Sequence, residues 1–344
     1  MSSLLDRISA RQAWIGSIIF ALVFTGVIWF FGSNLQHFVE ILLPDQGASW
    51  YFWKLPVRDS WTMNIVWELY LAHQLSVWGA IYWAQRNLRG KPYTETLNKY
   101  NLVTLGVNAL FVVLHLVQTQ LWFDGLAQDV PIWTSQGSVI IMLVVVLIIE
   151  NQRRGLFMDR KAGKPFTAEV TAFFRRNHTY VFAWALVYTF WFHPMAVDPQ
   201  LISGFLYMFL LFTQVSLAYT TIHLNPKWII LLESYVAGHA LIVAVYNTAF
   251  FGSADIWPMF FAGFTFMFIF TQMYALKLSK TAYNAITLLY IAFIVWLYAP
   301  FGFGRATTNL LRLEMLWIPI ILYGLAAAFA AVAYIYQRQV LSKD

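Results

Sequence analysis

Two short stretches of this chain place ionisable side chains inside long apolar runs. Residues 67–75 read Trp-Glu-Leu-Tyr-Leu-Ala-His-Gln-Leu, and residues 232–241 read Leu-Glu-Ser-Tyr-Val-Ala-Gly-His-Ala-Leu. An ionisable group in lipid costs about 2.5–3.5 kcal/mol, so such groups usually mark a site or a packed polar partner. We therefore take Glu68 and Glu233 as candidate catalytic acid–base residues, and His73 and His239 as candidate ligands of a cofactor or a metal ion.

The composition indicates that water is not the main solvent of the chain. Of the 344 residues, 60% are hydrophobic, 19% are aromatic and only 11% are charged, whereas soluble domains contain about 25% charged residues. The sequence has no cysteine. That absence excludes disulfides, thiolate-ligated haem, Fe–S clusters and covalently attached c-type haem, and it leaves b-type haem and carboxylate or imidazole metal sites open.

Ten apolar runs are long enough to cross a membrane core of about 30 Å. They predict an all-α, polytopic integral membrane bundle of about ten helices, with both termini cytoplasmic. The runs are 13–31, 61–84, 100–122, 132–149, 180–192, 201–224, 228–250, 257–276, 282–298 and 316–336.

The basic residues predict which side of the membrane each loop occupies. The chain has 22 lysine and arginine residues. If the N-terminus is inside and the chain crosses the membrane ten times, only four of them lie on the outer side: Lys54, Arg58, Arg305 and Arg312. This distribution follows the positive-inside rule, and it predicts a bacterial plasma (inner) membrane protein. The net charge of +6 is thereby explained by topology, so nucleic acid is not expected as a partner.

We expect residues 1–344 to form a single transmembrane domain, with two sets of five spans (1–178 and 179–344) as a possible repeat. Residues 33–60 are predicted to form an outer interfacial segment, because Trp50-Tyr51-Phe52-Trp53 resembles an aromatic belt. Residues 151–179 are predicted to form a cytoplasmic loop that carries a short amphipathic surface helix, Thr167 to Phe174, with Phe166, Val170 and Phe173 facing lipid.

Polar side chains recur at helical spacing in several spans, and we expect these faces to point into the bundle. The third span carries Asn101, Thr104, Asn108, His115 and Gln118, and the sixth carries Thr213, Ser216, Thr220 and His223. These stripes add two histidines, His115 and His223, to the candidate cofactor ligands. The candidate polar lining of a site is Asn64, Asn108, Gln118, Gln214 and Tyr235.

The glutamate and the histidine of each stretch cannot bind one ligand from the same helix. Glu68 and His73 are five residues apart, which separates them by about 140° around a helix with 3.6 residues per turn. Glu233 and His239 are six residues apart, which separates them by about 120°. Any site must therefore be assembled across helices.

Three functions and one purely structural role fit these residues. The first is a redox subunit that holds b-type haem or a metal ion, in which histidines from different helices ligate the iron and glutamates protonate a quinone. The partners would then include the lipid bilayer, quinone and other membrane subunits. The structural alternative is two buried hydrogen-bonded pairs that only fix helix packing.

The second function is a proton-coupled secondary transporter. Spans two and seven would occupy equivalent places in a five-plus-five inverted repeat, which would relate His73 to His239 near the midplane. The third is a membrane-embedded enzyme that modifies lipids through a His/Glu pair. The sequence does not decide whether the chain is an enzyme.

Overall fold

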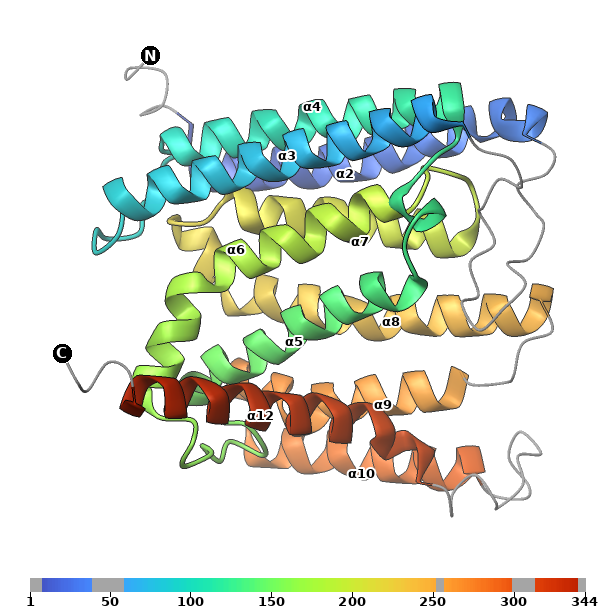
Figure 1. Cartoon of the computed structure of the whole chain (residues 1–344). Coiled ribbons are helices and arrows are strands. Elements are labelled where there is room, and N and C mark those ends of the chain that lie inside the picture. The colour runs from blue at the N-terminus through green and yellow to red at the C-terminus, as the bar shows by residue number, and fades with distance from the viewer. Residues whose placement is uncertain (1–7, 39–58, 252–256, 299–312, 340–344) are drawn as a thin grey trace. The chain divides into compact units, whose positions relative to one another are not determined.

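The computed structural model describes residues 8–38, 59–251, 257–298 and 313–339 (Figure 1). In this part of the chain every regular element is a helix. The chain divides into two compact units, Met1–Met142 with Thr179–Asn225, and Leu143–His178 with Pro226–Asp344. One of the three boundaries falls between His178 and Thr179, and the other two follow Met142 and Asn225, so helices α5 and α6 each contribute one part to each unit.

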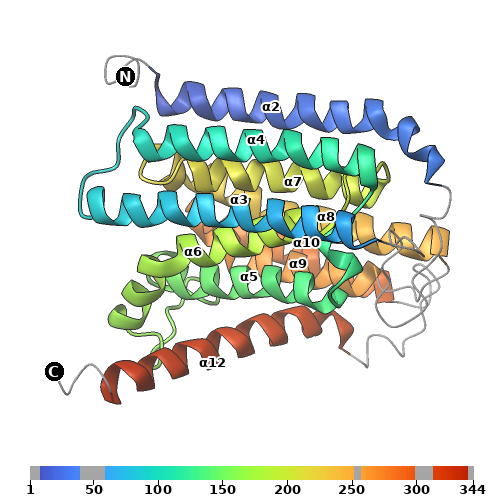
Figure 2. The same cartoon turned by 45° about the horizontal axis from the view of Figure 1, so that its top comes forward.

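Among the described residues, the first unit contains four α-helices, three short 3-10 helices and parts of α5 and α6. The α2 and α4 helices each begin with a capping box, in which an N-cap side chain and the side chain three residues later bond each other's backbone. Helix α7 lies beside α2 and α4, and α4 lies beside α3 (Figure 2). Its elements are α2 (Ala10–Phe31), η1 (Gly32–His37), α3 (Ser60–Asn87), α4 (Lys99–Trp122), η3 (Leu126–Gln128), α5 (Ile132–Arg154), α6 (Ala168–Phe192), α7 (Pro199–Ser216) and η4 (Thr221–Leu224).

The second unit is organised around α9, which packs against α8, α10 and α12. It also contains the C-terminal part of α5 and the N-terminal part of α6. Its remaining elements are α8 (Pro226–Phe251), α9 (Trp257–Phe270), η5 (Gln272–Leu276), α10 (Lys280–Tyr298), η6 (Glu314–Leu316) and α12 (Trp317–Gln339).

The protein is an all-α assembly of membrane-spanning helices. Eight helices of the described residues are long and apolar enough to cross a membrane. Large apolar side chains such as Phe30 and Leu289 are 75% and 71% exposed, as expected of surfaces that contact lipid. The other two predicted spans are also helices, α3 with 28 residues and α6 with 25, but they carry more polar residues.

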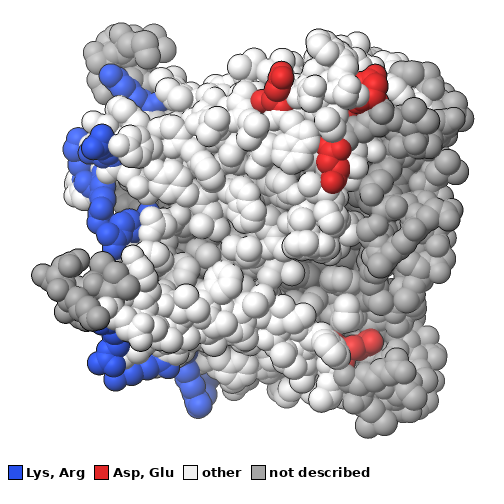
Figure 3. Space-filling model, in the orientation of Figure 1, with Lys and Arg blue, Asp and Glu red and all other residues white. Residues whose placement is uncertain are grey.

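The described basic residues gather at particular helix ends. Apart from Arg175 and Arg176, the eighth and ninth residues of α6, every described lysine and arginine lies at or near the ends where, in the first unit, α2 and α4 begin and α3 ends, and where, in the second, α8 and α10 begin and α5 and α12 end. On the face drawn in Figure 3, the visible basic side chains (blue) and acidic side chains (red) lie in separate groups. We refer to these helix ends as the basic ends, and the positive-inside rule predicts that they are cytoplasmic.

Two predicted segments differ from the structure or lie outside it. The segment Thr167 to Phe174 is not a separate surface helix, because α6 begins at Ala168 and continues unbroken to Phe192. Phe166 and Val170 are 5% and 0% exposed, so they pack into the protein rather than against lipid, and Phe173 is half-buried. Most of the predicted outer segment 33–60, including Trp50 to Trp53, lies outside the described residues.

Candidate functional site

His73 occupies the centre of a buried polar cluster in the first unit, which we call the His73–His115 cluster (His73, Asn108, His115, Gln118 and Trp191). The indole N–H of Trp191 donates to Nδ1 of His73 at 3.1 Å. Because indole can only donate, the histidine proton is on Nε2, which donates to Oδ1 of Asn108 at 2.8 Å. The ring is 0% exposed and stacks on Phe111 with an interplanar angle of 8°.

His115 bonds the end of a neighbouring helix. Its Nδ1 lies 2.9 Å from Oε1 of Gln118, and its Nε2 lies 3.1 Å and 2.8 Å from the carbonyl oxygens of Phe190 and His193. The last carbonyl groups of a helix have no partner within the helix. His115 therefore satisfies carbonyl groups where α6 ends, and Gln118 in turn donates to the carbonyl of Asp124 at 3.0 Å.

The polar stripe of α4 also binds the place where the predicted sixth span is interrupted. Helix α7 ends at Ser216, and the 3-10 helix η4 follows after a short turn. The amide of Asn101 donates to the carbonyl oxygens of Ser216 and Ala218, both at 2.8 Å. The amide of Asn108 donates to Oγ of Ser216 at 2.8 Å. The predicted inward-facing stripe is confirmed, and its partners are backbone and side-chain groups of the same unit.

These contacts leave no nitrogen of His73 or His115 open for a ligand. Axial ligation of haem needs one ring nitrogen on the iron, so either imidazole would first lose a hydrogen bond inside a buried cluster. Among the residues that the structure describes, there is no group of three or more His, Cys, Asp or Glu side chains suited to a metal ion. The geometry of this cluster therefore favours a role in helix packing.

The remaining candidates of the first unit do not join this cluster. Asn64 and Glu68 are exposed on α3, although the sequence analysis expected them in a polar lining or a catalytic pair. The reason is rotational: α3 buries the face of Val66, Tyr70 and His73, and a residue two positions from Val66 or Tyr70 points about 200° away.

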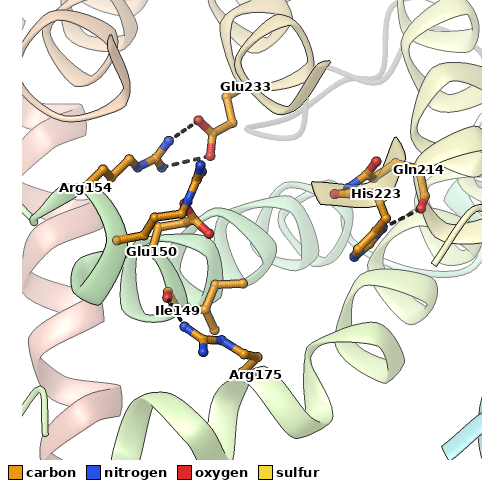
Figure 4. Close-up of polar contacts among 8 residues, drawn as sticks. Ile149, Glu150, Arg154, Arg175, Gln214, His223 and Glu233 are labelled. Carbon is orange, nitrogen blue, oxygen red and sulfur yellow. Dashed lines mark hydrogen bonds and ion pairs between the residues drawn. The ribbon is translucent and has the colours of Figure 1, made fainter. Parts of the chain in front are cut away.

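His223 and Gln214 bond each other across the turn that follows α7. Nδ1 of His223 donates to the carbonyl oxygen of Gln214 at 3.0 Å, and the Gln214 amide donates back to the carbonyl of His223 at 3.2 Å (Figure 4). This reciprocal pair holds η4 against the end of α7. It gives both residues a local structural role at that turn.

The second unit contains a buried ion pair between Arg154 of α5 and Glu233 of α8. The guanidinium makes two bonds to the carboxylate, 2.5 Å from Nη1 to Oε2 and 2.8 Å from Nη2 to Oε1 (Figure 4). The side chains are 0% and 7% exposed. Glu233 is the eighth residue of α8, so the pair lies about 10 Å along this helix from its basic end.

The local backbone explains how Arg154 is positioned. Gly155 follows it with φ 75°, and a Cβ at this glycine would meet the carbonyl carbon of Asp159 at 2.5 Å. Glycine is the usual residue where a helix ends in this left-handed conformation. Helix α5 therefore ends in a tight turn directly after Arg154. The neighbouring charges are bonded elsewhere: Glu150 pairs with Arg153, and Arg175 donates to the carbonyl of Ile149 (Figure 4).

The ion pair forms part of the wall of a small cavity, which we call the charged cavity. The space that admits the centre of a water molecule is ≈ 20 Å³, enough for about one water. Nε of Arg154 is buried and has no hydrogen-bond partner among the described residues. The wall consists of Leu143, Val146, Leu147, Arg154, Glu233, Val236, Phe264, Met267, Gln272 and Leu322.

The helix that contributes Phe264 and Met267 to this wall is interrupted at its basic end. Helix α9 has 14 residues, so it is about 21 Å long and too short to cross a membrane alone. The backbone carbonyl of Phe270, left open by the break, accepts a bond of 2.7 Å from the N–H of Met158. Thr271 donates to the carbonyl of Leu156 at 2.9 Å and lies 2.5 Å from the hydroxyl of Tyr323. The next helix, η5, begins with Gln272 in the cavity wall.

His239 and Tyr235 lie on α8 and are half-buried, but neither forms the cavity wall. His73 belongs to the first unit and His239 to the second, so neither unit by itself brings the two histidines together. A shared site for them and a five-plus-five repeat stay predictions. For His73 the expected polar contact with another helix is confirmed, with both Asn108 and Trp191.

Arg154 falls within residues 151–179, which were predicted from the sequence to form a cytoplasmic loop. It is instead among the largest fully buried side chains. A signal was present, because Arg153 and Arg154 directly follow the apolar run 132–149 and precede a glycine. Which of two adjacent arginines turns inward depends on the rotation of α5, and the local sequence does not fix that rotation.

No protein-family model matches this chain, no curated protein resembles it in sequence, and no solved structure matches it.

Proposed function

We propose that the protein is a secondary transporter whose substrate site is the charged cavity of the second unit. The observation that carries the proposal is a buried, bidentate Arg154–Glu233 pair in the wall of a small cavity. Ionisable groups at membrane depth mark substrate or ion pathways more often than packing contacts.

The interrupted helix supports the same proposal. Non-helical backbone at membrane depth is tolerated where it is buried in protein or lines a cavity, and discontinuous helices form the substrate sites of many transporters. Both α9 and Gln272 of η5, on either side of Thr271, contribute side chains to the cavity wall. A hinge at this break would move Phe264 and Met267 relative to the ion pair and would change access to the cavity.

The cavity has room for about one water, ≈ 20 Å³, and a transporter must open it to each side in turn. The chain has no native cysteine, so a single introduced cysteine reports accessibility. We expect Leu147→Cys, in the cavity wall, to react with a membrane-impermeant maleimide in right-side-out and in inside-out vesicles. Ile148→Cys is the matched control, because Ile148 is 0% exposed on the same helix and is not part of the wall. Reaction of Leu147→Cys from one side only would contradict the proposal.

An optical spectrum of the purified protein tests the redox alternative. A haem-binding subunit would give a Soret band that changes on reduction. The transporter proposal predicts no such band.

A further inference from the structure

We propose that the charged cavity binds one small carboxylate monoanion together with one proton. Arg154 would bind the carboxylate, Glu233 would take the proton, and both would cross the membrane in one electroneutral step. This inference rests on the proposed transport function, and it adds the charge, the chemical class and the coupling of the substrate.

The net charge of the buried site carries the argument. Arg154 and Glu233 together are neutral, and both are buried. An unpaired charge in a site of low dielectric is strongly unfavourable. An anion alone would leave the site with a net negative charge, whereas an anion that enters with a proton on Glu233 leaves it neutral.

A cationic substrate does not satisfy the same condition. It would pair with Glu233 and leave the guanidinium of Arg154 unpaired. Arginine does not lose its proton in proteins, whereas a carboxylate can gain one. The pair is therefore asymmetric, and only an anion can replace one of its members without leaving a buried charge.

The other titratable groups near the pair do not supply this proton. On α5, Glu150 interacts electrostatically with Arg154, but the carboxylate of Glu150 is bonded to Arg153. On α12, Tyr323 also interacts electrostatically with Arg154, but its hydroxyl is bonded to the hydroxyl of Thr271. Helix α9 and the first residue of η5 contribute Phe264, Met267 and Gln272 to the wall, and none of these titrates. Glu233 is thus the carboxyl group placed to exchange a proton with the cavity.

The hydrogen-bond donors and the polarity of the cavity wall indicate the chemical class. The cavity as described has ≈ 20 Å³, space for about one water, so it must widen to admit the anion. A guanidinium presents parallel N–H groups that match a carboxylate in a bidentate bond, as the bond to Glu233 already shows. The buried Nε–H of Arg154 has no described partner and offers a further donor. The other wall residues are mostly aliphatic or aromatic, which suits a short apolar body. A dianion such as phosphate would require a second proton, for which the wall offers no second carboxylate.

The exchange of partners balances in bonds and charge. The two N–H···O bonds from Arg154 to Glu233 break, and two equivalent bonds form to the carboxylate of the incoming anion. One proton from water at the open side of the cavity binds to the carboxylate of Glu233. On release at the other side the proton leaves, the anion leaves, and the original pair forms again.

The test is uptake of radiolabelled pyruvate by proteoliposomes that contain the intact chain. At one proton per anion, a gradient of one pH unit, with the interior alkaline, should drive the pyruvate concentration inside the vesicles to about tenfold the concentration outside. Protein-free vesicles, measured in parallel, should not show this uptake. A membrane potential imposed without a pH gradient should drive none. Potential-driven uptake, or accumulation of butylammonium in place of pyruvate, would overturn the inference.

Variants assign the roles. Glu233→Gln resembles the protonated side chain, so pyruvate should still protect Leu147→Cys from the maleimide while the pH gradient no longer drives accumulation. Arg154→Lys keeps the positive charge but loses the two parallel N–H donors of the guanidinium. It should lower the apparent affinity for pyruvate about tenfold. Glu150→Gln is the matched control on the same helix and should transport as the unaltered chain does. The coupling measurement uses the unaltered chain, so it stands even where a variant fails to fold.

The outcomes separate the two proposals. If Leu147→Cys still reacts from both sides but pyruvate neither protects it nor accumulates, transport stands and the carboxylate inference fails. Protection by inorganic phosphate in place of pyruvate would also overturn the chemical class. If Leu147→Cys does not react from both sides, the transport proposal itself fails.

Discussion

The two polar regions of this protein are built differently. In the His73–His115 cluster, side chains that carry no full charge bond one another and the ends of helices. Both ring nitrogens of His73 have complementary partners, and His115 lies against the carbonyl groups where α6 ends. In the charged cavity, two full charges face each other beside empty space, and one guanidinium nitrogen has no described partner. A saturated neutral cluster fixes one packing arrangement, whereas a charged pair beside a space can exchange partners.

The largest effect should come from breaking the ion pair on one side. Arg154→Met leaves the carboxylate of Glu233 buried without its partner, which should cost about 3–5 kcal/mol of unfolding free energy. The double variant Arg154→Met/Glu233→Leu removes both charges and should recover most of that loss, as measured by unfolding in detergent. It should not transport. A double variant that is as unstable as the single one, or that transports normally, would contradict the role of the pair.

A smaller effect is expected in the neutral cluster. Asn108→Ala leaves Nε2 of His73 and the hydroxyl of Ser216 without the bonds that Asn108 provides, and such a loss costs about 1–3 kcal/mol. The variant should be less stable in the same unfolding measurement and should still transport. Loss of transport in a folded Asn108→Ala protein would instead place the working site in the first unit.

The smallest effect should be a gain in stability. Gln74, next to His73 on α3, is 3% exposed, and neither atom of its amide has a hydrogen-bond partner among the described residues. Replacing a buried amide that lacks partners with an apolar side chain of similar size removes an unfavourable burial. Gln74→Leu should therefore raise the unfolding free energy by roughly 1 kcal/mol. A loss of that size would show that the amide has a partner in the membrane-embedded protein.

The membrane-spanning architecture followed from the sequence because it depends on the composition and length of each run. The polar stripe of α4 could also be predicted, because residues at helical spacing lie on one face of a helix. The two helix interruptions, after Ser216 and after Phe270, could not be predicted from the sequence, because neither contains proline or glycine. They are instead held by distant groups, Asn101 on α4 and the N–H of Met158. Such tertiary contacts are invisible to local propensity.

The candidate site was predictable in part. Glu233 was found because a carboxylate in an apolar run is costly, and the same reasoning failed for Glu68, which lies on an exposed face of α3. Depth alone identified the histidines, but it could not tell a ligand from a packing residue. That distinction depends on what the two ring nitrogens bond, and for His73 both partners are more than 30 residues away in the chain.

The central claim, that the working site is the charged cavity and not the neutral cluster, is tested most directly by placing a cysteine in each region. Leu147→Cys reports the cavity, and Leu116→Cys, 8% exposed and next to His115 on α4, reports the cluster. Both are labelled with the same impermeant maleimide in vesicles of both orientations. The account predicts that Leu147→Cys reacts from both sides and that Leu116→Cys reacts from neither. Reaction of Leu116→Cys from both sides, with Leu147→Cys protected, would contradict it.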